Sequence, residues 1–208
     1  MTEGEIRDNE WVTAMATTES TTGSTVLPGV PPFTADDLLK FPDDGNRYEL
    51  FNGSLLVSPA PTPLHQRVAS RLCMILEAVA PLELEPLQTV NLRASDLDVW
   101  IPDVVVVPAA ATESVGLMFA PRDIRLAVEV VSPSSRAQDR LLKAGAYAAA
   151  GIPVYWRVEM DEGPTLYVYE LDGKTYAPPT AHKAGTVAEL HSPFPVSFDP
   201  ADLMRRRG

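Results

Sequence analysis

The sequence predicts an α/β protein in which a mixed β-sheet is flanked by helices. Two nearly continuous apolar runs, VVVV at 104–107 and LAVEVV at 126–131, are typical of central strands that are covered on both faces. Apolar residues at spacings of three and four between 63 and 80 indicate an amphipathic helix. Because helical and strand patterns then alternate along the chain, we expect helices on the faces of one mixed sheet.

The composition indicates one globular domain preceded by a disordered arm. The chain has 208 residues, 45% hydrophobic and 22% charged, which is enough for a sizeable core in a single domain at 33–208. Residues 1–32 are rich in Thr, Ser, Gly and Glu and lack apolar periodicity, which predicts disorder. The acidic start MTEGEIRDNEW lacks the pattern of a signal peptide, and no apolar run approaches the roughly 20 residues of a membrane span, so we expect a cytoplasmic protein.

The first half of the domain is expected to contain a short helix, a hairpin and a longer helix. Thr34 can cap a helix in FTADDLLKFP, and RYELFNGSLLVSPAP has two strand-like runs around the turn dipeptide Asn52-Gly53. The apolar stripe at 63–80 predicts the clearest helix, with Cys73 as a buried thiol on it. Strands are expected at about 86–92, 97–101, 103–107 and 125–131.

The second half is expected to contain a helix followed by strands. Ser134 or Ser135 can cap SRAQDRLLKAGAYAAAG, and Gly151 follows its last residues, which predicts a helix at about 136–150. VYWRVEM and TLYVYEL alternate as strands joined by DEGP, and KTYAPP is a candidate for one more.

The net charge of −11 argues against tight binding to nucleic acid. Proteins that grip DNA non-specifically usually do so with a basic surface, because neutralised phosphates release counterions. Five acids and one arginine in residues 1–32 account for −4 of this charge, which leaves −7 for the domain. Clustered carboxylates can bind a metal ion, however, and the ion then cancels part of their charge.

Two acidic residues at predicted strands are the candidates for chemistry, since the sequence has no phosphate-binding Gly-rich loop and no GxSxG, CxxC or HExxH motif. Asp103 follows Pro102 and precedes VVVV, whereas Glu129 lies inside the next long apolar run. If these strands are neighbours, the two carboxylates meet, and each raises the pKa of the other unless a cation lies between them. Mg²⁺ often binds one or two carboxylates and several waters, so a magnesium site would explain a Glu inside an apolar strand.

The predicted helix that follows brings Lys143 near the end of the strand that carries Glu129. Its long side chain can return toward the carboxylates. There an ammonium would orient an attacking water and stabilise negative charge on a phosphate.

A series of segments occurs in a recognisable order: RYELFNG, SPAPTPLHQRV, PDVVVV, AVEVVSPSS, DRLLKAGAYAAAG and IPVYW. Over residues 33–175 this series resembles the Uma-type family of restriction endonucleases, a branch of the PD-(D/E)XK nuclease superfamily. The resemblance implies a restriction-endonuclease-like core. It also implies that Asp103 is the Asp of the PD motif, that Glu129 is the acid of the second half, and that Glu49 in RYEL is an additional acid of the site.

The resemblance further implies a Mg²⁺ site, which Mn²⁺ could also occupy, formed by these three carboxylates and the backbone carbonyl of Val130. The superfamily lysine is expected two residues after the Glu, where this chain has Val131. As in the Uma-type branch, the lysine is expected on the following helix, where Lys143 in DRLLKAGAY is the candidate. His65 matches a recurrent family position and could contact substrate or cap the first long helix.

Each of these side chains could instead have an ordinary structural role. The alternatives are a turn at Asp103, an ion pair of Glu129 with Arg125 or Arg157, an ion pair of a solvated Glu49 with Arg47, and an exposed Lys143.

We therefore predict a Mg²⁺-dependent endonuclease that hydrolyses phosphodiester bonds of DNA. The alternative is a catalytically degenerate nuclease-fold module for binding or interaction, which the charge of −11 and Val131 favour. A hydrolase of another phosphorylated substrate is a third option. A homodimer is expected because cutting both DNA strands needs two sites.

Overall fold

The computed structural model describes residues 27–131 and 142–205. Helices and strands alternate along these ranges. In chain order they are α1 (Ala35–Leu38), β1 (Arg47–Phe51), β2 (Ser54–Ser58), α2 (Pro63–Glu77), β3 (Leu84–Gln88), β4 (Asn91–Arg93), β5 (Val99–Trp100), β6 (Val104–Pro108), α3 (Ala109–Ser114), β7 (Met118–Phe119), η1 (Pro121–Asp123), β8 (Leu126–Val130), α4 (Ala144–Ala149), β9 (Val154–Glu159), β10 (Thr165–Asp172), β11 (Thr175–Tyr176), β12 (Thr180–Lys183), β13 (Ala188–Leu190), β14 (Val196–Phe198) and η3 (Pro200–Leu203).

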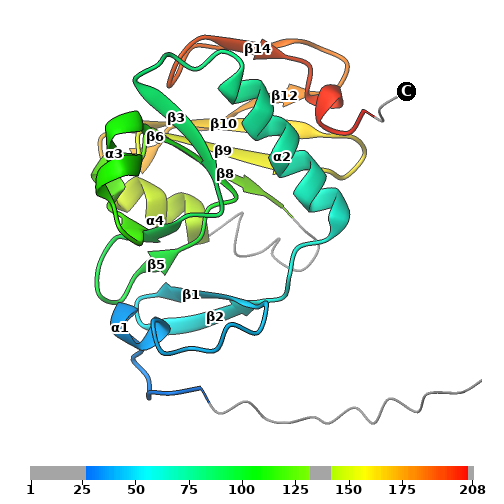
Figure 1. Ribbon diagram of the computed structural model, residues 1–208. Helices are drawn as coiled ribbons and strands as arrows, with labels where there is room; N and C mark the ends of the chain where they lie inside the picture. The colour runs from blue at the N-terminus through cyan, green and yellow to red at the C-terminus, as the bar shows by residue number, and fades with distance from the viewer. Residues whose placement is uncertain (1–26, 132–141, 206–208) are drawn as a thin grey trace, which may run out of the picture.

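The main sheet is mixed, which confirms the predicted fold class. Its strands follow the order β11-β10-β9-β8-β6-β3, and β12 pairs with β10. β8 and β9 are parallel, whereas β6 is antiparallel to both β3 and β8. A second sheet, of order β2-β1-β5-β4-β7, lies below the main sheet in the view of Figure 1.

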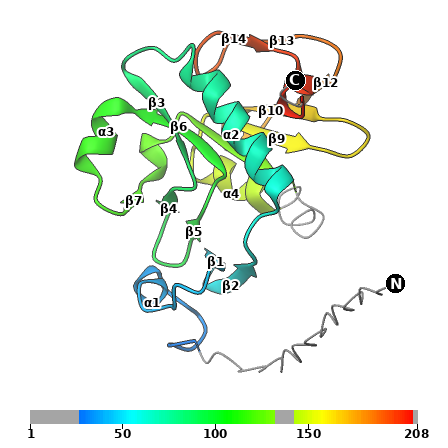
Figure 2. The same cartoon turned by 45° about the vertical axis from the view of Figure 1, so that its right-hand side comes forward.

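Alternation of side chains along β6 and β8 decides which residues face which helix. Val104 and Val128 pack into the core under α2, whereas Val105 and Ala127 pack into a second core with Tyr147 of α4. Figures 1 and 2 show the long helix α2 across one face of the sheet and α4 on the other. Because successive side chains of a strand point to opposite faces, Glu129 is directed toward α4.

The N-terminal part of the domain folds as the sequence predicts. Thr34 caps α1 in a capping box with Asp37, and β1 and β2 form an antiparallel hairpin. The turn uses Asn52 at φ 49° and Gly53 at φ 74°, a left-handed backbone that favours these two residue types. β1 of this hairpin carries Arg47 and Glu49.

Three expectations about elements need correction. The helix expected at 63–80 ends at Glu77, and Cys73 on it is half-buried rather than buried. The single strand expected at 86–92 is wrong: β3 belongs to the main sheet and β4 to the other, because Thr89 between them adopts φ 54° and turns the chain.

Other expectations fall wholly or partly outside the described ranges. The helix expected at 136–150 is seen as α4, and its first part, within 132–141, lies outside the described residues. The same holds for residues 1–26 of the expected arm. No helix in the described parts of the chain is long and apolar enough to span a membrane.

The C-terminal segment adds cover that the sequence patterns did not predict. β13 and β14 form a separate two-stranded sheet, and η3 follows it. Phe194, Phe198 and Leu203 from this segment pack into the core under α2. The α2 face of the main sheet is therefore largely closed by apolar contacts, whereas Glu129 of β8 is directed toward the α4 face.

Candidate active site

Asp103 lies directly before the first residue of β6. Its backbone N–H donates to the carbonyl of Val128 at 3.0 Å, and its Oδ2 accepts from the N–H of Val130 at 2.8 Å, so it is held against β8. Arg47 Nη1 donates to Oδ1 at 2.8 Å, and His65 Nε2 lies 3.0 Å from Oδ2. Burial raises the pKa of the Asp103 carboxyl, but the hydrogen bonds and nearby positive charge outweigh this effect and hold the pKa below its usual value.

Glu129 is a carboxylate in the middle of an otherwise apolar strand. It is buried, with 2% of its surface exposed. Lys143 Nζ donates to its Oε1 at 2.9 Å, and Tyr147 Oη donates to the same oxygen at 2.5 Å. Burial of an unpaired carboxylate costs several kcal/mol, so these two donors from one helix account for its presence in the strand.

Glu49 connects the second sheet to this cluster. Its Oε1 accepts from the backbone N–H of Ile101 at 2.8 Å and lies 3.2 Å from Lys143 Nζ. Lys143, which is only 4% exposed, therefore lies with its ammonium between carboxylates that come from two different sheets. The alternative considered for Lys143, an exposed helix lysine, is therefore wrong.

Tyr147 lies one helical turn after Lys143 on α4 and is fully buried. Its ring packs edge-to-face against Trp100 at a centroid distance of 5.3 Å and against Tyr155 at 5.4 Å. Burial, together with the negative charges of Glu129 and Glu49, raises the pKa of the Tyr147 hydroxyl well above its usual value. The hydroxyl therefore stays protonated and donates a hydrogen bond to Glu129.

His65 lies in the first turn of α2, and its side chain is directed at Asp103 rather than at the helix end. The helix is capped by Thr62, whose Oγ1 accepts from the backbone N–H of His65 at 3.3 Å. The ring is 8% exposed, and its Nδ1 is buried without a hydrogen-bond partner among the described residues. The capping role considered for His65 is therefore wrong.

The other structural alternatives also differ from what is found. Arg47 pairs with Asp103 and not with Glu49, which is 4% exposed and not solvated. Arg125 donates to a backbone carbonyl, and Arg157 Nε lies 3.0 Å from Glu159 Oε1, so neither arginine is the cation of Glu129.

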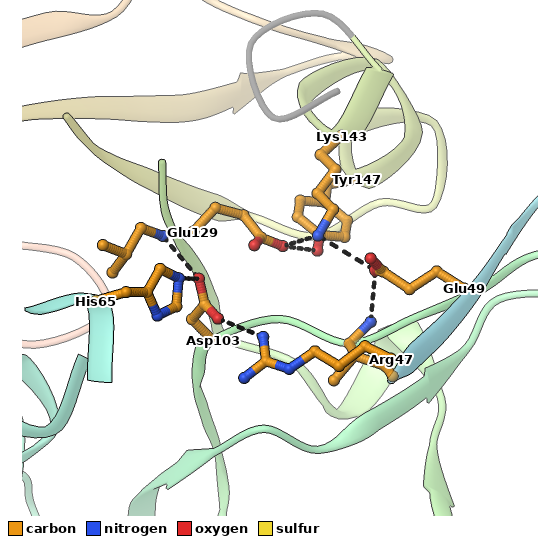
Figure 3. A network of polar contacts seen from close by, with 9 residues as sticks. Arg47, Glu49, His65, Asp103, Glu129, Lys143 and Tyr147 are labelled. Atoms are coloured by element: carbon orange, nitrogen blue, oxygen red, sulfur yellow. Dashed lines mark hydrogen bonds and ion pairs between the residues drawn. The ribbon is translucent and has the colours of Figure 1, made fainter. Parts of the chain in front are cut away.

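Side chains that are distant in sequence meet in one largely buried polar network (Figure 3). It contains all the predicted site side chains, Glu49, His65, Asp103, Glu129 and Lys143, and two that the sequence reasoning missed, Arg47 and Tyr147. Val130 takes part through its N–H, which binds Asp103. The spacing of four between Lys143 and Tyr147, which places both on one helix face, was the signal that could have identified Tyr147.

The donor types of this network fit a hard divalent cation. Carboxylate oxygens are the ligands that Mg²⁺ prefers, and one or two carboxylates with waters suffice for it. Glu49 and Glu129 already share one buried cation, the ammonium of Lys143. Within residues 27–131 and 142–205, however, no three His, Cys, Asp or Glu side chains are arranged so that they could hold one metal ion. The ammonium would therefore have to move for an ion to bind between the two glutamates.

Comparison with known proteins identifies the family and the fold of this chain. The family model Uma2, described as "Putative restriction endonuclease", matches residues 35–203. A crystal structure described as a "putative nuclease belonging to DUF820" from Anabaena variabilis ATCC 29413 has the same fold, with a TM-score of 0.68 at 19% identity. The match covers 83% of this chain and 98% of that one. No match was found among curated proteins. The chain belongs to the Uma2 family and has the fold of a nuclease-like relative.

Proposed function

We propose that this protein is a Mg²⁺-dependent endonuclease that hydrolyses phosphodiester bonds of DNA. The observation that carries the proposal is the convergence of Glu49 and Glu129 on the buried ammonium of Lys143, beside a buried Asp103. Three acids and a lysine that meet in one network are expensive to bury, and functional sites are where such arrangements concentrate. Membership of the Uma2 family supports the same class of activity.

The ligands proposed for the ion are the carboxylates of Glu49, Asp103 and Glu129 and the backbone carbonyl of Val130. Since no three acids of the described residues are arranged as ligands of one metal ion, ion binding would require Lys143 and the two glutamates to move. A divalent cation at such a site supplies positive charge that polarises a phosphate oxygen and stabilises the charge of the transition state. Mn²⁺ has the same preference for oxygen ligands and is the natural probe.

The protein side chains would provide positioning and a movable positive charge. Asp103 is fixed by donors from three elements, Arg47 of β1, His65 of α2 and Val130 of β8, so its carboxylate is preorganised. Lys143 would orient the attacking water and stabilise charge on the phosphate, since its flexible arm can leave one of its two carboxylates. His65, at the side of Asp103, is proposed to contact the substrate.

We also propose the partner and the setting. The substrate would be DNA. The protein would be a homodimer, because cutting two strands requires two sites, and it would be located in the cytoplasm. The net charge of −11 predicts weak and strongly metal-dependent DNA binding, because the bound cation has to offset part of the repulsion between the carboxylates and the phosphates.

Nicking of supercoiled plasmid in Mg²⁺ or Mn²⁺ tests the proposal. Wild-type protein should nick the plasmid, EDTA should stop the reaction, and Glu129→Ala and Lys143→Ala should each abolish it. The matched controls are Glu170→Ala and Lys174→Ala, which change exposed residues of the same charges and should keep full activity. A folded wild-type protein that leaves plasmid intact under these conditions contradicts the proposal.

A binding or interaction module that retains the nuclease fold is the second candidate. Two observations favour it: Lys143 already neutralises Glu49 and Glu129, and no three-ligand metal group exists in the described parts of the chain. Such a module would bind no divalent cation at this site. Mn²⁺ binding that disappears in Asp103→Ala would therefore exclude it.

A further inference from the structure

Packing of the Tyr147 ring does not require its hydroxyl group. The ring is fully buried between Trp100 and Tyr155, and phenylalanine would fill the same space. A buried hydroxyl is tolerated only with a hydrogen-bond partner. Here the partner is Glu129 Oε1 at 2.5 Å, so the hydroxyl donates its hydrogen bond to the carboxylate of the candidate site.

Tyr147 and Lys143 bind the same oxygen but differ in mobility. Lys143 Nζ is 2.9 Å from Glu129 Oε1 and also contacts Glu49 at 3.2 Å. A lysine reaches its partners through a flexible four-carbon arm, whereas a tyrosine has few rotatable bonds and presents its hydroxyl from a rigid ring. The ring of Tyr147 is also fixed by its two aromatic neighbours.

We infer that Tyr147 is a positioning residue for Glu129, which it holds in place when Lys143 turns from this carboxylate toward the attacking water. The effect of Tyr147 on cation binding and catalysis rests on the proposed function. The hydrogen bond itself does not rest on it and can be tested without metal.

The test compares Tyr147→Phe with Tyr176→Phe. Both substitutions remove one hydrogen-bonded tyrosine hydroxyl, but Tyr176 is partly buried and donates to the carbonyl of Ile152, 2.9 Å away and outside the network. Near-UV circular dichroism and the thermal midpoint establish that both variants are folded.

The first measurement uses protein without metal. The buried hydroxyl proton of Tyr147 should give a protected downfield proton resonance that is absent in Tyr147→Phe and present in Tyr176→Phe. A crystal structure of Tyr147→Phe should show the Glu129 carboxylate displaced. A carboxylate that stays in its wild-type position overturns the inference.

The second measurement is the dissociation constant for Mn²⁺ alone. Loss of a group that orients a metal ligand commonly weakens metal affinity by about 10–100-fold, so we expect at least about a tenfold weakening in Tyr147→Phe and no change in Tyr176→Phe. Unchanged affinity in Tyr147→Phe overturns the inference while the proposed function stands. If wild-type protein neither binds Mn²⁺ nor nicks DNA, the proposed function fails, and the position of Glu129 in the metal-free variant decides the inference alone.

Discussion

Lys143 Nζ lies 2.9 Å from Glu129 Oε1, although the two residues belong to different elements and are 14 positions apart. The position two residues after Glu129, where the nuclease superfamily is expected to have its lysine, is Val131, a buried apolar residue. The ammonium reaches the acid from the α4 side instead. A lysine at the start of α4 therefore supplies the cation of Glu129, and the strand position is apolar.

Lys143→Met should abolish DNA nicking and lower stability in the absence of metal. Removing one partner of a buried ion pair leaves uncompensated charge, here on Glu49 and Glu129, and costs roughly 3–5 kcal/mol. A divalent cation that replaces the ammonium should return part of this stability, because binding to the folded state raises the free energy of unfolding. Thermal unfolding should therefore show a larger upward shift with Mn²⁺ for Lys143→Met than for wild type.

The control for this prediction is Lys174→Met, which removes an exposed lysine at the turn after β10. It should show the wild-type response to Mn²⁺. Equal shifts for Lys143→Met and wild type would mean that the ion does not replace the ammonium.

Asp103→Ala should weaken Mn²⁺ binding by at least about tenfold, which corresponds to about 1.4 kcal/mol. The reason is the loss of a preorganised carboxylate that Arg47, His65 and Val130 hold in place. Isothermal titration with Mn²⁺ measures the effect. Asp172→Ala, at the exposed end of β10, is the control that should leave the affinity unchanged. Wild-type affinity in a folded Asp103→Ala variant would remove Asp103 from the ligand set.

Gly53→Ala should destabilise the hairpin that carries Glu49. A Cβ at this position would lie 2.6 Å from Pro32 Cβ, and the backbone φ of 74° disfavours any side chain. We expect backbone strain and overpacking together to lower the free energy of unfolding by roughly 2–4 kcal/mol. Urea denaturation measures this loss, and amide exchange in β1 and β2 should become faster.

Gly173→Ala separates backbone strain from overpacking as causes of the loss of stability. This glycine also has a positive φ, 64°, but a Cβ there would meet no atom within 4 Å. The free energy of unfolding of Gly173→Ala should fall by only about 1–2 kcal/mol, which is the cost of the left-handed backbone. Equal losses for both variants would show that contact with Pro32 contributes nothing.

The partly buried Tyr176 should make stability fall at alkaline pH. Burial raises its pKa above the usual value of 10.0. The folded state therefore keeps the proton when the unfolded state loses it, so its contribution is complete below a pH of about 10 and is lost as the pH rises toward the folded pKa. Tyr176→Phe should reduce the alkaline loss by about 1 kcal/mol at a pH near 11, as measured by urea denaturation against a pH of about 8. An unchanged pH profile would place the alkaline loss on other groups.

The strand that follows Asp103 and the strand that carries Glu129 were predictable because nearly continuous apolar runs identify central strands regardless of context. The hairpin was predictable for a local reason, the turn chemistry of Asn52-Gly53. By contrast, the division of 86–92 between two sheets depends on the left-handed backbone of Thr89, a residue type whose sequence signal for this conformation is weak.

The sequence predicted the acids and the lysine that lie together in the candidate site, but it did not predict the residues that support them. Arg47 binds Asp103 across 56 positions, and Tyr147 binds Glu129 across 18, so each contact depends on how the sheets and α4 are placed relative to one another. In sequence, Arg47 looks like a partner of nearby Glu49, and Tyr147 looks like a core residue of an apolar helix face. The partners of Arg47 and Tyr147 are therefore set by the tertiary arrangement and not by the local sequence.

The most direct test of the account is a crystal of the wild-type protein soaked in Mn²⁺ and measured for anomalous scattering. We expect one or two Mn²⁺ peaks in contact with the carboxylates of Glu49, Asp103 and Glu129, with the ammonium of Lys143 displaced from its place between the two glutamates. An ordered network with no peak, and with Lys143 still bound to both Glu49 and Glu129 at a saturating Mn²⁺ concentration, would contradict the account.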